Sequence, residues 1–568
     1  MQKVLTAAEM REVDRLTTER YGIPSILLME NAAHAVARVI TEKLGGSVKG
    51  KSILILCGKG NNGGDGAALA RILWEQGARC FVYLIGKISD STGDARTNFE
   101  IVQRLAETQT GFFNLSETFI GISELENIDR ISEMFYVMKI DVCVDALFGT
   151  GFSGSMRAEF REVVRRFLNR KRPTTKDTIV VSVDIPSGIN ADSSWLGSDI
   201  PDDLVEEHVR VEDIARPDAT VTFTAPKIAN VSPPASRCNG DLTIAQIGTP
   251  SGLVEQTASQ LYLSEASDAE RFLRSSFFRN NSYKNKRGHS LIIAGSREFS
   301  GAAVLAGNSA MRSGVGLVTL VTAASSKDAA ASRILPEVMV RGVAETESGA
   351  VAEEAFDEVA DLLKKADSIA IGSGLSQNES TKRFVEKVVF GSSVPVVVDA
   401  DALNLLSPFG PPEGGTQNLT PPEGGTQNLI LTPHEGEFLR LLGTDDKDAI
   451  KDRVTAVREF AINYNVILVL KGERVLIGEP GGKVVVNPTG NSGLGKAGNG
   501  DTLTGIIAGF AAQAHSMNID LFETVVAAVY IAGMSGDVAE KKFGKRVMTA
   551  SDVRECLTDV FETFEKTN

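Results

Sequence analysis

Residues 52–66 read SILILCGKGNNGGDG, and this stretch decides the fold of the first half of the chain. A short apolar run, Ser52–Cys57, passes directly into a glycine-rich loop. Glycine permits positive φ and lets a ligand approach the backbone N–H groups closely. A helix-like segment follows, and the positive end of its dipole favours a bound anion. The pattern predicts a strand, a phosphate-binding loop and a helix of an α/β domain.

A second loop of this kind lies more than 400 residues further on. Residues 491–501 read NSGLGKAGNGD, again between an apolar segment and a helix-like one. The first loop does not have the G-x-G-x-x-G pattern of a dinucleotide fingerprint, and the second does not have the G-x-x-x-x-G-K-[ST] pattern of a P-loop. The pair indicates two nucleotide-handling sites on one polypeptide.

Length, charge and composition exclude several classes of protein. The chain has 568 residues, so two or more domains are expected. The net charge of −14 argues against nucleic acid as a partner, because a basic footprint would be needed. Five scattered cysteines without a C-x-x-C motif indicate neither a disulfide framework nor a zinc site. No apolar run reaches membrane-spanning length and the N-terminus has no apolar signal core, so we expect a cytoplasmic protein without a membrane partner.

Apolar runs and helix-like segments alternate in both halves, which predicts two parallel sheets, each covered by helices on both faces. The domains are expected at 1–250 and 265–568, with a linker at 251–264. Residues 191–218 are polar and acidic and read as a loop insertion. Residues 411–429 contain a direct duplication, PPEGGTQNL, to which no function is attached. The strands predicted in the first half are Ser52–Cys57, Arg79–Ile85, Val142–Leu147, Thr178–Ile185, Thr220–Thr224 and Asp241–Ile247. Those in the second half include Ser290–Ala294, Gly316–Thr322, Ser368–Gly372, Val394–Val398, Leu429–Leu431, Val466–Leu470 and an edge strand, Val484–Val486.

Polar residues gather at the predicted carboxyl ends of three strands in the first half. In an open α/β sheet this edge is where ligands bind. Asn62, Asp145 and Ser187 offer hard oxygen ligands that suit a monovalent or divalent cation. Asp184 is placed to act as an acid or base. The alternative is that each aspartate only caps a helix or turn.

The first half resembles the NAD(P)H-hydrate epimerase domain over roughly residues 1–250. The resemblance rests on LMENA (28–32), GNNGGDG (60–66), DALFGTG (145–151) and DIPSG (184–188). It implies a Rossmann-like three-layer αβα domain that interconverts the R and S epimers of hydrated NAD(P)H, with K⁺ held by Asn62, Asp145 and Ser187. Asp184 would be catalytic. The substrate would contact Asn61, Asn62, Gly63, Gly64, Asp65, Gly149, Thr150, Gly151, Phe152, Ser153, Gly154, Ser155 and Asp184.

The second half has a matching series of polar strand ends. Gly500 and Asp501 sit where a helix begins, so the N–H groups can hold a transferring phosphoryl group and the aspartate can take a proton from a hydroxyl. Asp399 and Asp401 follow Val394–Val398, and His434 follows Leu429–Leu431. A structural role for His434 and an ordinary glycine turn with a capping Asp501 are the alternatives.

These motifs resemble the ribokinase-like superfamily, and in particular the ADP/ATP-dependent NAD(P)H-hydrate dehydratase, over roughly residues 265–568. The resemblance implies Mg²⁺ with ADP or ATP, and Asp501 as the proton acceptor. The chain departs from the family at Glu435, where proline is more usual, and at Asn499, where serine or threonine is. The substrate would contact Ala302, Gly374, His434 and Asp501, and the nucleotide would contact Lys471, Gly472, Glu473, Arg474, Val475 and Gly500.

Together the halves predict a bifunctional repair enzyme, an isomerase and a lyase, that epimerises NAD(P)H hydrate and dehydrates the S form through a phosphorylated intermediate. We expect small-molecule substrates and a homo-oligomer. Two alternatives remain at this point. One is a vitamin or sugar kinase with a nucleotide-binding N-terminal module, and the other is an N-terminal module that binds without catalysis. The sequence does not distinguish ADP from ATP or NADH hydrate from NADPH hydrate.

Overall fold

The computed structural model describes residues 1–108, 118–125, 128–169, 177–194, 211–280, 282–409 and 428–565. The chain forms two compact units, one of Lys3–Ser259 and one of Met1–Gln2 with Gln260–Asn568. The duplication at 411–429, apart from its last two residues, and most of the 191–218 insertion lie outside the described residues. The segment 251–264, predicted as a linker, contains a helix, α8 (Ser251–Glu255), and a strand, β9 (Leu261–Leu263).

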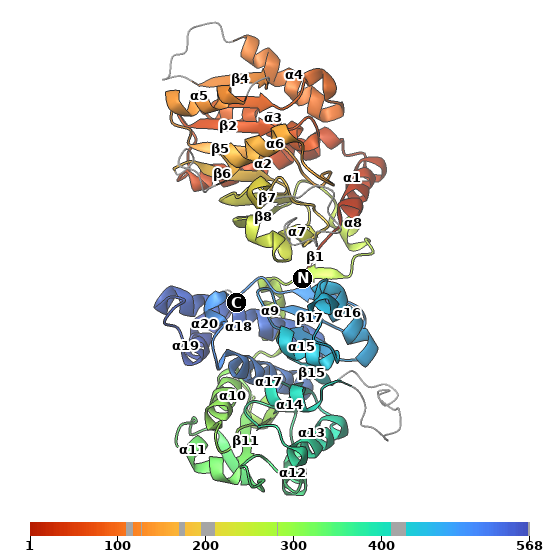
Figure 1. Cartoon of the computed structure of the whole chain (residues 1–568), viewed down its shortest axis with the longest axis vertical. Helices are drawn as coiled ribbons and strands as arrows, with labels where there is room; N and C mark the ends of the chain where they lie inside the picture. The colour runs from red at the N-terminus through yellow and green to blue at the C-terminus, as the bar shows by residue number, and fades with distance from the viewer. Residues whose placement is uncertain are drawn as a thin grey trace. The chain divides into compact units, whose positions relative to one another are not determined.

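The N-terminal unit is built on a parallel sheet of seven strands in the order β4-β3-β2-β5-β6-β7-β8 (Figure 1). All of them except β4 were predicted, and β4 was missed because its alternating, half-exposed pattern is typical of an edge. The strands are β2 (Ser52–Cys57), β3 (Arg79–Leu84), β4 (Phe119–Glu124), β5 (Val142–Ala146), β6 (Ile179–Val183), β7 (Ala219–Phe223) and β8 (Asp241–Ala245).

Alternation along β2 produces the three layers of this unit. Ile53 and Ile55 pack into one hydrophobic core, and Leu54 and Leu56 into another. Because successive side chains point to opposite faces, a strand that is apolar at every position must be covered on both. The helices of the unit are α1 (Ala7–Tyr21), α2 (Ser25–Lys43), α3 (Asn61–Glu75), α4 (Gly93–Glu107), α5 (Asp129–Val137), α6 (Ala158–Val163), α7 (Ile228–Val231) and α8.

The C-terminal unit has a sheet of eleven strands in the order β1-β9-β18-β17-β16-β15-β14-β13-β10-β11-β12. The strands from β16 to β12 are parallel, whereas β17 is antiparallel to both of its neighbours. The strands are β1 (Gln2–Lys3), β9, β10 (His289–Ile293), β11 (Leu317–Ala323), β12 (Met339–Val343), β13 (Ser368–Ile371), β14 (Val396–Val398), β15 (Leu429–Leu431), β16 (Ile467–Leu470), β17 (Leu476–Gly478) and β18 (Val484–Val486).

One strand prediction in this unit was wrong. Val484–Val486 was predicted as an edge strand, but β18 lies between β17 and β9 and is fully buried. The prediction failed because neither neighbour of β18 was predicted as a strand. β9 comes from the segment that was predicted to be a linker, and β17 is only three residues long.

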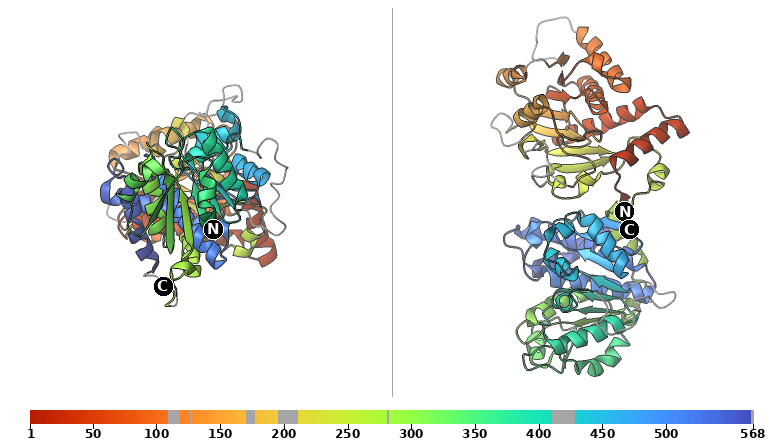
Figure 2. Two further views of the ribbon diagram at one scale, coloured as in Figure 1. Left: turned by 90° about the horizontal axis from the view of Figure 1, so that it is seen from below. Right: turned by 45° about the vertical axis from the view of Figure 1, so that its right-hand side comes forward.

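Helices cover both faces of this sheet as well (Figure 2). Two of them, α17 (Asn499–Met517) and α18 (Leu521–Phe543), contribute much of a large hydrophobic core. The others are α9 (Ala266–Ser275), α10 (Ser300–Arg312), α11 (Lys327–Ala331), α12 (Ala355–Leu363), α13 (Glu379–Gly391), α14 (Ala400–Leu405), α15 (Glu435–Leu441), α16 (Arg453–Tyr464), α19 (Ala550–Glu555) and α20 (Leu557–Glu565). Two three-layer αβα units are therefore present, as predicted.

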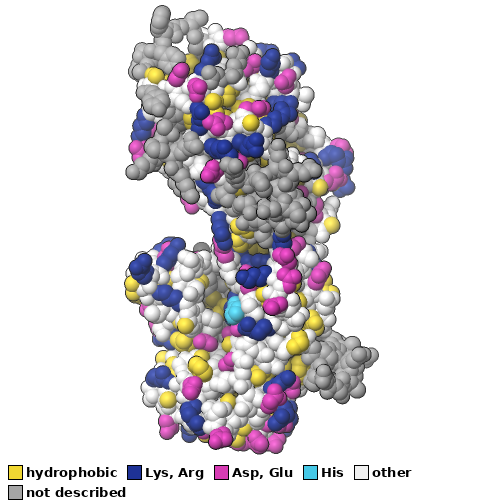
Figure 3. Space-filling model, in the orientation of Figure 1, with side chains coloured by type: hydrophobic (Ala, Val, Ile, Leu, Met, Phe, Trp, Pro, Cys, Tyr) yellow, Lys and Arg dark blue, Asp and Glu magenta, His cyan; other side chains and the backbone are white. Residues whose placement is uncertain are grey.

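Among the described residues, α18 alone is long and apolar enough to cross a membrane, and 61% of its most apolar window is buried inside the protein. A core helix of a globular domain passes the same test, and α18 packs against α9, α17 and α20. On the face drawn in Figure 3, acidic side chains are interspersed among the basic ones. That mixture differs from the continuous basic stripe expected for nucleic-acid binding.

Candidate functional sites

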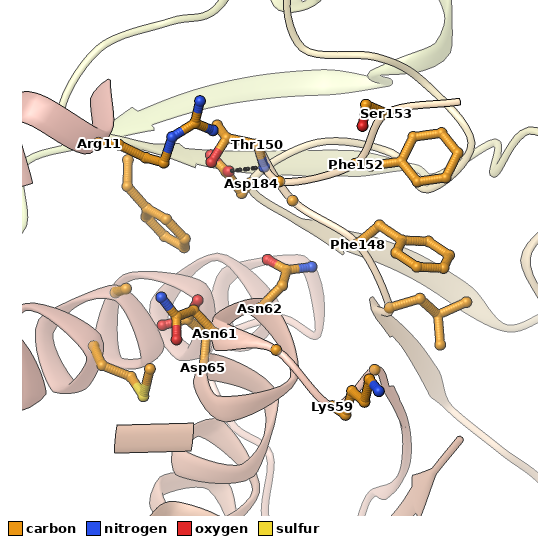
Figure 4. A pocket seen from close by; sticks show the side chains of 18 of the residues that line it. Arg11, Lys59, Asn61, Asn62, Asp65, Phe148, Thr150, Phe152, Ser153 and Asp184 are labelled. Atoms are coloured by element: carbon orange, nitrogen blue, oxygen red, sulfur yellow. Dashed lines mark hydrogen bonds between the residues drawn. The ribbon is translucent and has the colours of Figure 1, made fainter. Parts of the chain in front are cut away.

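A cavity of about 710 Å³ opens at the carboxyl edge of the seven-stranded sheet. It is lined by the glycine loop after β2, the loop after β5, the end of β6 and part of α1 (Figure 4). The sites predicted from separate stretches of sequence thus come together. The predicted residues that line it are Asn61, Asn62, Asp65, Gly149, Thr150, Gly151, Phe152, Ser153, Ser155 and Asp184.

The glycine loop is shorter than predicted because α3 already begins at Asn61. Gly63 and Gly64 do not line the cavity, and their small size serves packing instead. A Cβ on Gly63 would lie 1.7 Å from the carbonyl oxygen of Gly58, and one on Gly64 would lie 2.7 Å from the Cα of Ala95. The two glycines therefore let the first turn of α3 fold back against the strand end. Gly154 also lies outside the cavity lining.

Asp184 is held in place by three donors. Its Oδ1 accepts hydrogen bonds from Lys227 Nζ at 2.7 Å and Thr222 Oγ1 at 3.0 Å. Its Oδ2 accepts one from the backbone N–H of Thr150 at 3.2 Å. The φ of Asp184 is 67°, a strained conformation that persists only when the surroundings enforce it. The arrangement holds an oriented carboxyl group at the cavity.

Lys227 was missed by the sequence reasoning. It is fully buried, and its Nζ also donates to Thr222 Oγ1 and to the carbonyl of Phe223. A lysine is almost never buried without a partner. The signal that could have identified it is its position just after the predicted strand Thr220–Thr224, at the same sheet edge as Asp184.

The predicted cation ligands, Asn62, Asp145 and Ser187, lie near the carboxyl ends of β2, β5 and β6. Asp145 is fully buried and accepts hydrogen bonds from Ser182 Oγ, from the Ser187 backbone and Oγ, and at 3.4 Å from the Leu147 backbone. Among the residues that the structure describes, no cation pairs with it, and burial raises the pKa of its carboxyl. Asn62 has a buried side-chain amide nitrogen without a partner. A buried carboxylate lacking a counter-charge, beside hydroxyl and amide oxygens, fits a monovalent cation.

The second site lies at the carboxyl edge of the eleven-stranded sheet, where α17 begins. Asp501 is in the first turn of α17, and burial raises its pKa to about 6. The nearby hydroxyl of Ser373 lowers this pKa, whereas a neighbouring carboxylate, Asp399, raises it further. A carboxylate of this kind is well matched to accept a proton near neutral pH.

A buried ion pair stands next to Asp501. Lys471 Nζ donates to Asp399 Oδ1 at 2.7 Å. The hydroxyls of Thr432 and Thr504 donate to the same carboxylate at 2.9 and 2.8 Å. These bonds, together with the lysine charge, hold the pKa of Asp399 below its usual value against the opposing effect of burial. Asp399, Thr432 and Thr504 were not predicted as site residues, although Asp399 was recognised as a polar strand end.

The Lys471 ammonium faces the start of α17. A Cβ on Gly500 would lie 3.5 Å from Lys471 Nζ and 3.7 Å from Asp399 Oδ2. The absence of a side chain at Gly500 leaves room there, between a cation and the positive end of a helix. The structure thus brings together Lys471, Gly500 and Asp501, which were predicted from two separate stretches.

His434 caps α15 rather than standing free. Its Nδ1 accepts hydrogen bonds from the backbone N–H groups of Gly436 and Glu437 at 3.0 and 3.3 Å. Glu437 in turn accepts from the His434 backbone N–H at 2.8 Å. The side chain stays 56% exposed, and its Nε2 lies 3.5 Å from Glu437 Oε1 while the cap fixes the ring. The structural and the ligand-contact interpretations of His434 are therefore compatible.

The remaining predicted residues of this edge lie in two groups. Ala302 and Gly374 are neighbours, since a Cβ on Gly374 would lie 3.1 Å from Ala302 Cβ. In the segment from Lys471 to Val475, Gly472 lies against a buried arginine, Arg453, whose guanidinium nitrogen would be 2.5 Å from an added Cβ. Arg453 pairs at 3.5 Å with Glu435, the residue that departs from the family pattern. Arg474 donates to the carbonyl of Pro488.

No group of three or more His, Cys, Asp or Glu side chains within the described part of the chain is arranged to hold a metal ion. Mg²⁺ commonly uses only one or two carboxylates together with phosphate oxygens and water. Asp399 and the buried Glu437 lie near Lys471, as does Asp501, so this edge fits a metal that arrives with a nucleotide. All five cysteines are reduced and buried.

Comparison with known proteins agrees with this geometry. The family described as YjeF-related protein N-terminus matches residues 25–229, and the family described as NAD(P)H-hydrate dehydratase matches residues 290–559. A bifunctional NAD(P)H-hydrate repair enzyme of Moorella thermoacetica is 37% identical over 566 residues, 99% of this chain and 97% of the relative. One of Thermofilum pendens is 31% identical, over 96% of this chain and 94% of the relative. The ADP/ATP-dependent NAD(P)H-hydrate dehydratase of Bacillus subtilis, co-crystallised with ATP/Mg²⁺, is 31% identical with a TM-score of 0.43, over 52% of this chain and 97% of that one.

Two α/β units, each with polar and acidic residues at the carboxyl edge of its sheet, define a two-site enzyme of the nucleotide-handling class. The chain belongs to the family of bifunctional NAD(P)H-hydrate repair enzymes. The predicted family, the fold class and the combination of an isomerase with a lyase are thereby confirmed.

Proposed function

We propose that the N-terminal unit epimerises NAD(P)H hydrate at C6 and that the C-terminal unit dehydrates the S form with ADP or ATP. The observation that carries the proposal is the similarity of the chain, over 99% of its length, to a bifunctional relative, and the cavity beside Asp184 and the grouping of Lys471, Gly500 and Asp501 support it. The R form, which the second site does not accept, would then be converted at the first.

In the first unit, the substrate would occupy the cavity beside Asp184. The oriented Oδ2 of Asp184 serves as proton acceptor at the ring, and the hydrogen bond from Lys227 to Oδ1 fixes the position of this side chain. Asn61, Thr150 and the loop up to Ser155 would bind the remainder of the dinucleotide. A K⁺ ion held by Asn62, Asp145 and Ser187 would supply the positive charge that the buried Asp145 lacks.

In the second unit, Asp501 would accept the proton of the C6 hydroxyl while that oxygen takes up a phosphoryl group. Lys471 and the N-terminal N–H groups of α17 stabilise the charge on the phosphoryl oxygens. Phosphate is a better leaving group than hydroxide, so elimination then restores the dihydropyridine ring. Bound Mg²⁺ would offset phosphate charge, and residues 471–475 with Gly500 would hold the adenine nucleotide.

The test follows absorbance of the reduced ring after mixed-epimer NADH hydrate is incubated with the protein, Mg²⁺ and ADP or ATP. We expect complete recovery with the wild-type chain. Recovery of only the S half would overturn the epimerase assignment, and no recovery would overturn the whole proposal. Transfer of phosphate to a vitamin or sugar alcohol instead would support the kinase alternative.

Two matched variants separate the sites. Asp184→Asn should recover only the S half, and Asp501→Asn should recover neither while still equilibrating the epimers. Each substitution removes one charge without a change in side-chain volume, so each variant serves as the folding control for the other. Full dehydration by Asp501→Asn would exclude this residue as the base.

A further inference from the structure

Two of the carboxyl groups that line the epimerase cavity, Asp184 and Asp65, have opposite surroundings. Asp184 is compensated by a lysine and two further donors. Asp65, in α3, is 9% exposed and forms no hydrogen bond or ion pair with any residue that the structure describes. A buried carboxylate without partners is costly, so Asp65 is stable there in its protonated form.

The two groups face the same space. Asp184 enters it from the end of β6 and Asp65 from α3, with Asn62 between them (Figure 4). Burial raises the pKa of Asp65 well above its usual value, and the nearby negative charge of Asp184 raises it further. Carboxyl groups whose surroundings separate their protonation states form an acid and base pair.

We propose that Asp65 is a further catalytic residue, the proton donor of the epimerisation, working against Asp184 as acceptor on the other face of the substrate ring. The inference rests on the proposed epimerase function and deepens it, because inversion at one carbon requires chemistry on two faces.

The reaction balances with water as the only co-reactant. The Asp65 carboxyl gives its proton to the C6 hydroxyl, the C6–O bond breaks, and water leaves as the ring-nitrogen lone pair forms a C6=N bond. A second water attacks C6 from the opposite face, the electron pair returns to nitrogen, and Asp184 takes the proton. One water leaves and one enters without net oxidation. The reverse reaction, or exchange with solvent, resets the two carboxyls.

Asp14, on α1, is the rival donor. One of its carboxylate oxygens is buried without a partner, and burial raises its pKa to about 6. The strongest charge acting on Asp14 is Lys227, whereas the strongest acting on Asp65 is Asp184. Asp14 is only partly buried and the Lys227 charge favours its ionised form, whereas Asp65 is buried and the Asp184 charge favours its protonated form, so we assign the donor to Asp65.

The first experiment uses the wild-type full chain in H₂¹⁸O without nucleotide, so that only epimerisation occurs. Pure R hydrate is converted, and the S product is separated and weighed by mass spectrometry at early times, against an enzyme-free control. We expect one ¹⁸O atom in each S molecule formed. Retention of ¹⁶O would show that the C6–O bond stays intact and would overturn the inference. Absence of any S product would instead overturn the proposed epimerase function.

The second experiment compares three substitutions in the full chain. Asp65→Asn should lower the epimerisation rate at least about 100-fold, the lower end of what a positioned acid contributes. Asp90→Asn makes the same replacement of a carboxyl by an amide at the exposed rim of the cavity and should retain the wild-type rate. Asp14→Asn should lose less than Asp65→Asn, and the reverse order would transfer the donor to Asp14. Circular dichroism and thermal unfolding report whether the N-terminal unit of each variant is folded.

Discussion

At the scale of single residues, the dehydratase site depends on one buried ion pair. Asp399 is 1% exposed and holds Lys471 at 2.7 Å, with Thr432 and Thr504 as additional donors. Removing one member of such a pair leaves the other charge buried and unmatched. Lys471 then loses both its counter-ion and its orientation toward Gly500.

We therefore predict that Asp399→Asn lowers the free energy of unfolding by about 3 kcal/mol and reduces the dehydration rate, mainly in kcat. Denaturant titration and steady-state kinetics measure the two effects. Thr432→Val is the matched control, since it removes one hydrogen bond to the same carboxylate and should cost about 1 kcal/mol. Equal losses in the two variants would contradict a special role of the ion pair.

The raised pKa of Asp501 predicts how the rate of dehydration changes with pH. A base acts only when ionised, and its pKa of about 6 means that protonation removes it below that pH. The kcat/KM for dehydration should rise with pH through about 6 and level off above it. Stopped-flow recovery of absorbance between pH 5 and 8 would measure this. The residual activity of Asp501→Asn should lack the step, and an unchanged step would assign the titration to another group.

The proposed K⁺ site has a readout that does not depend on activity. Because Asp145 is buried without a cation, an ion bound there stabilises the folded chain and raises its thermal unfolding temperature. We expect K⁺ to raise this temperature relative to choline at equal ionic strength in the wild-type chain, and not in Asp145→Asn. Calorimetry measures both. A K⁺ effect that survives the substitution would exclude Asp145 as a ligand.

At the scale of elements, glycines decide how closely α10 and α17 approach. A Cβ on Gly505 would lie 2.1 Å from the carbonyl oxygen of Ala306, which belongs to the facing helix. This contact is with backbone, so neither helix can yield cheaply. The same close packing holds the N-terminus of α17, and with it Gly500 and Asp501, at the edge of the sheet.

Gly505→Ala should therefore destabilise the chain by about 2 kcal/mol or more, although alanine has the better helix propensity. Gly391→Ala, in α13, meets no atom within 4 Å and should be neutral or slightly stabilising. Thermal unfolding of the two variants compares them directly. A stabilised Gly505→Ala protein would show that the helices can separate.

At the scale of the whole molecule, each unit has its own sheet and its own hydrophobic cores. The two activities should therefore be separable. A mixture of Asp184→Asn and Asp501→Asn chains should restore recovery of the R hydrate, because the S epimer released by one chain can diffuse to the other. The absorbance assay measures this at equimolar concentrations. Failure to complement would indicate that the product does not leave the chain that formed it.

The predicted homo-oligomer is a further expectation at this scale. Leu27, an apolar side chain in the first turn of α2, is 52% exposed and is a candidate for a subunit contact. Light scattering should give a mass above 60.6 kDa, the mass of one chain, and Leu27→Lys should lower it. The predicted cytoplasmic location is likewise an expectation, which cell fractionation would test.

Prediction from sequence succeeded where a strong local pattern coincided with the fold. Fully apolar strands such as β2, and acidic residues directly after strands, are readable because parallel strands bury both faces and meet at one edge. Strands that are short or half-exposed were missed, because they carry no long apolar run. β4 is a half-exposed edge, and β9 and β17 span three residues each.

The sequence by itself determined the family, the two α/β units and the aspartates at the sheet edges, because these depend on motifs and on local periodicity. Only the tertiary structure revealed which charged side chains pair with one another. Lys227 reaches Asp184 across 43 residues and Lys471 reaches Asp399 across 72, whereas Asp65 has no such partner among the described residues. The pKa of a side chain depends on its burial and on the charges and hydrogen bonds around it. These surroundings form only when distant segments fold together.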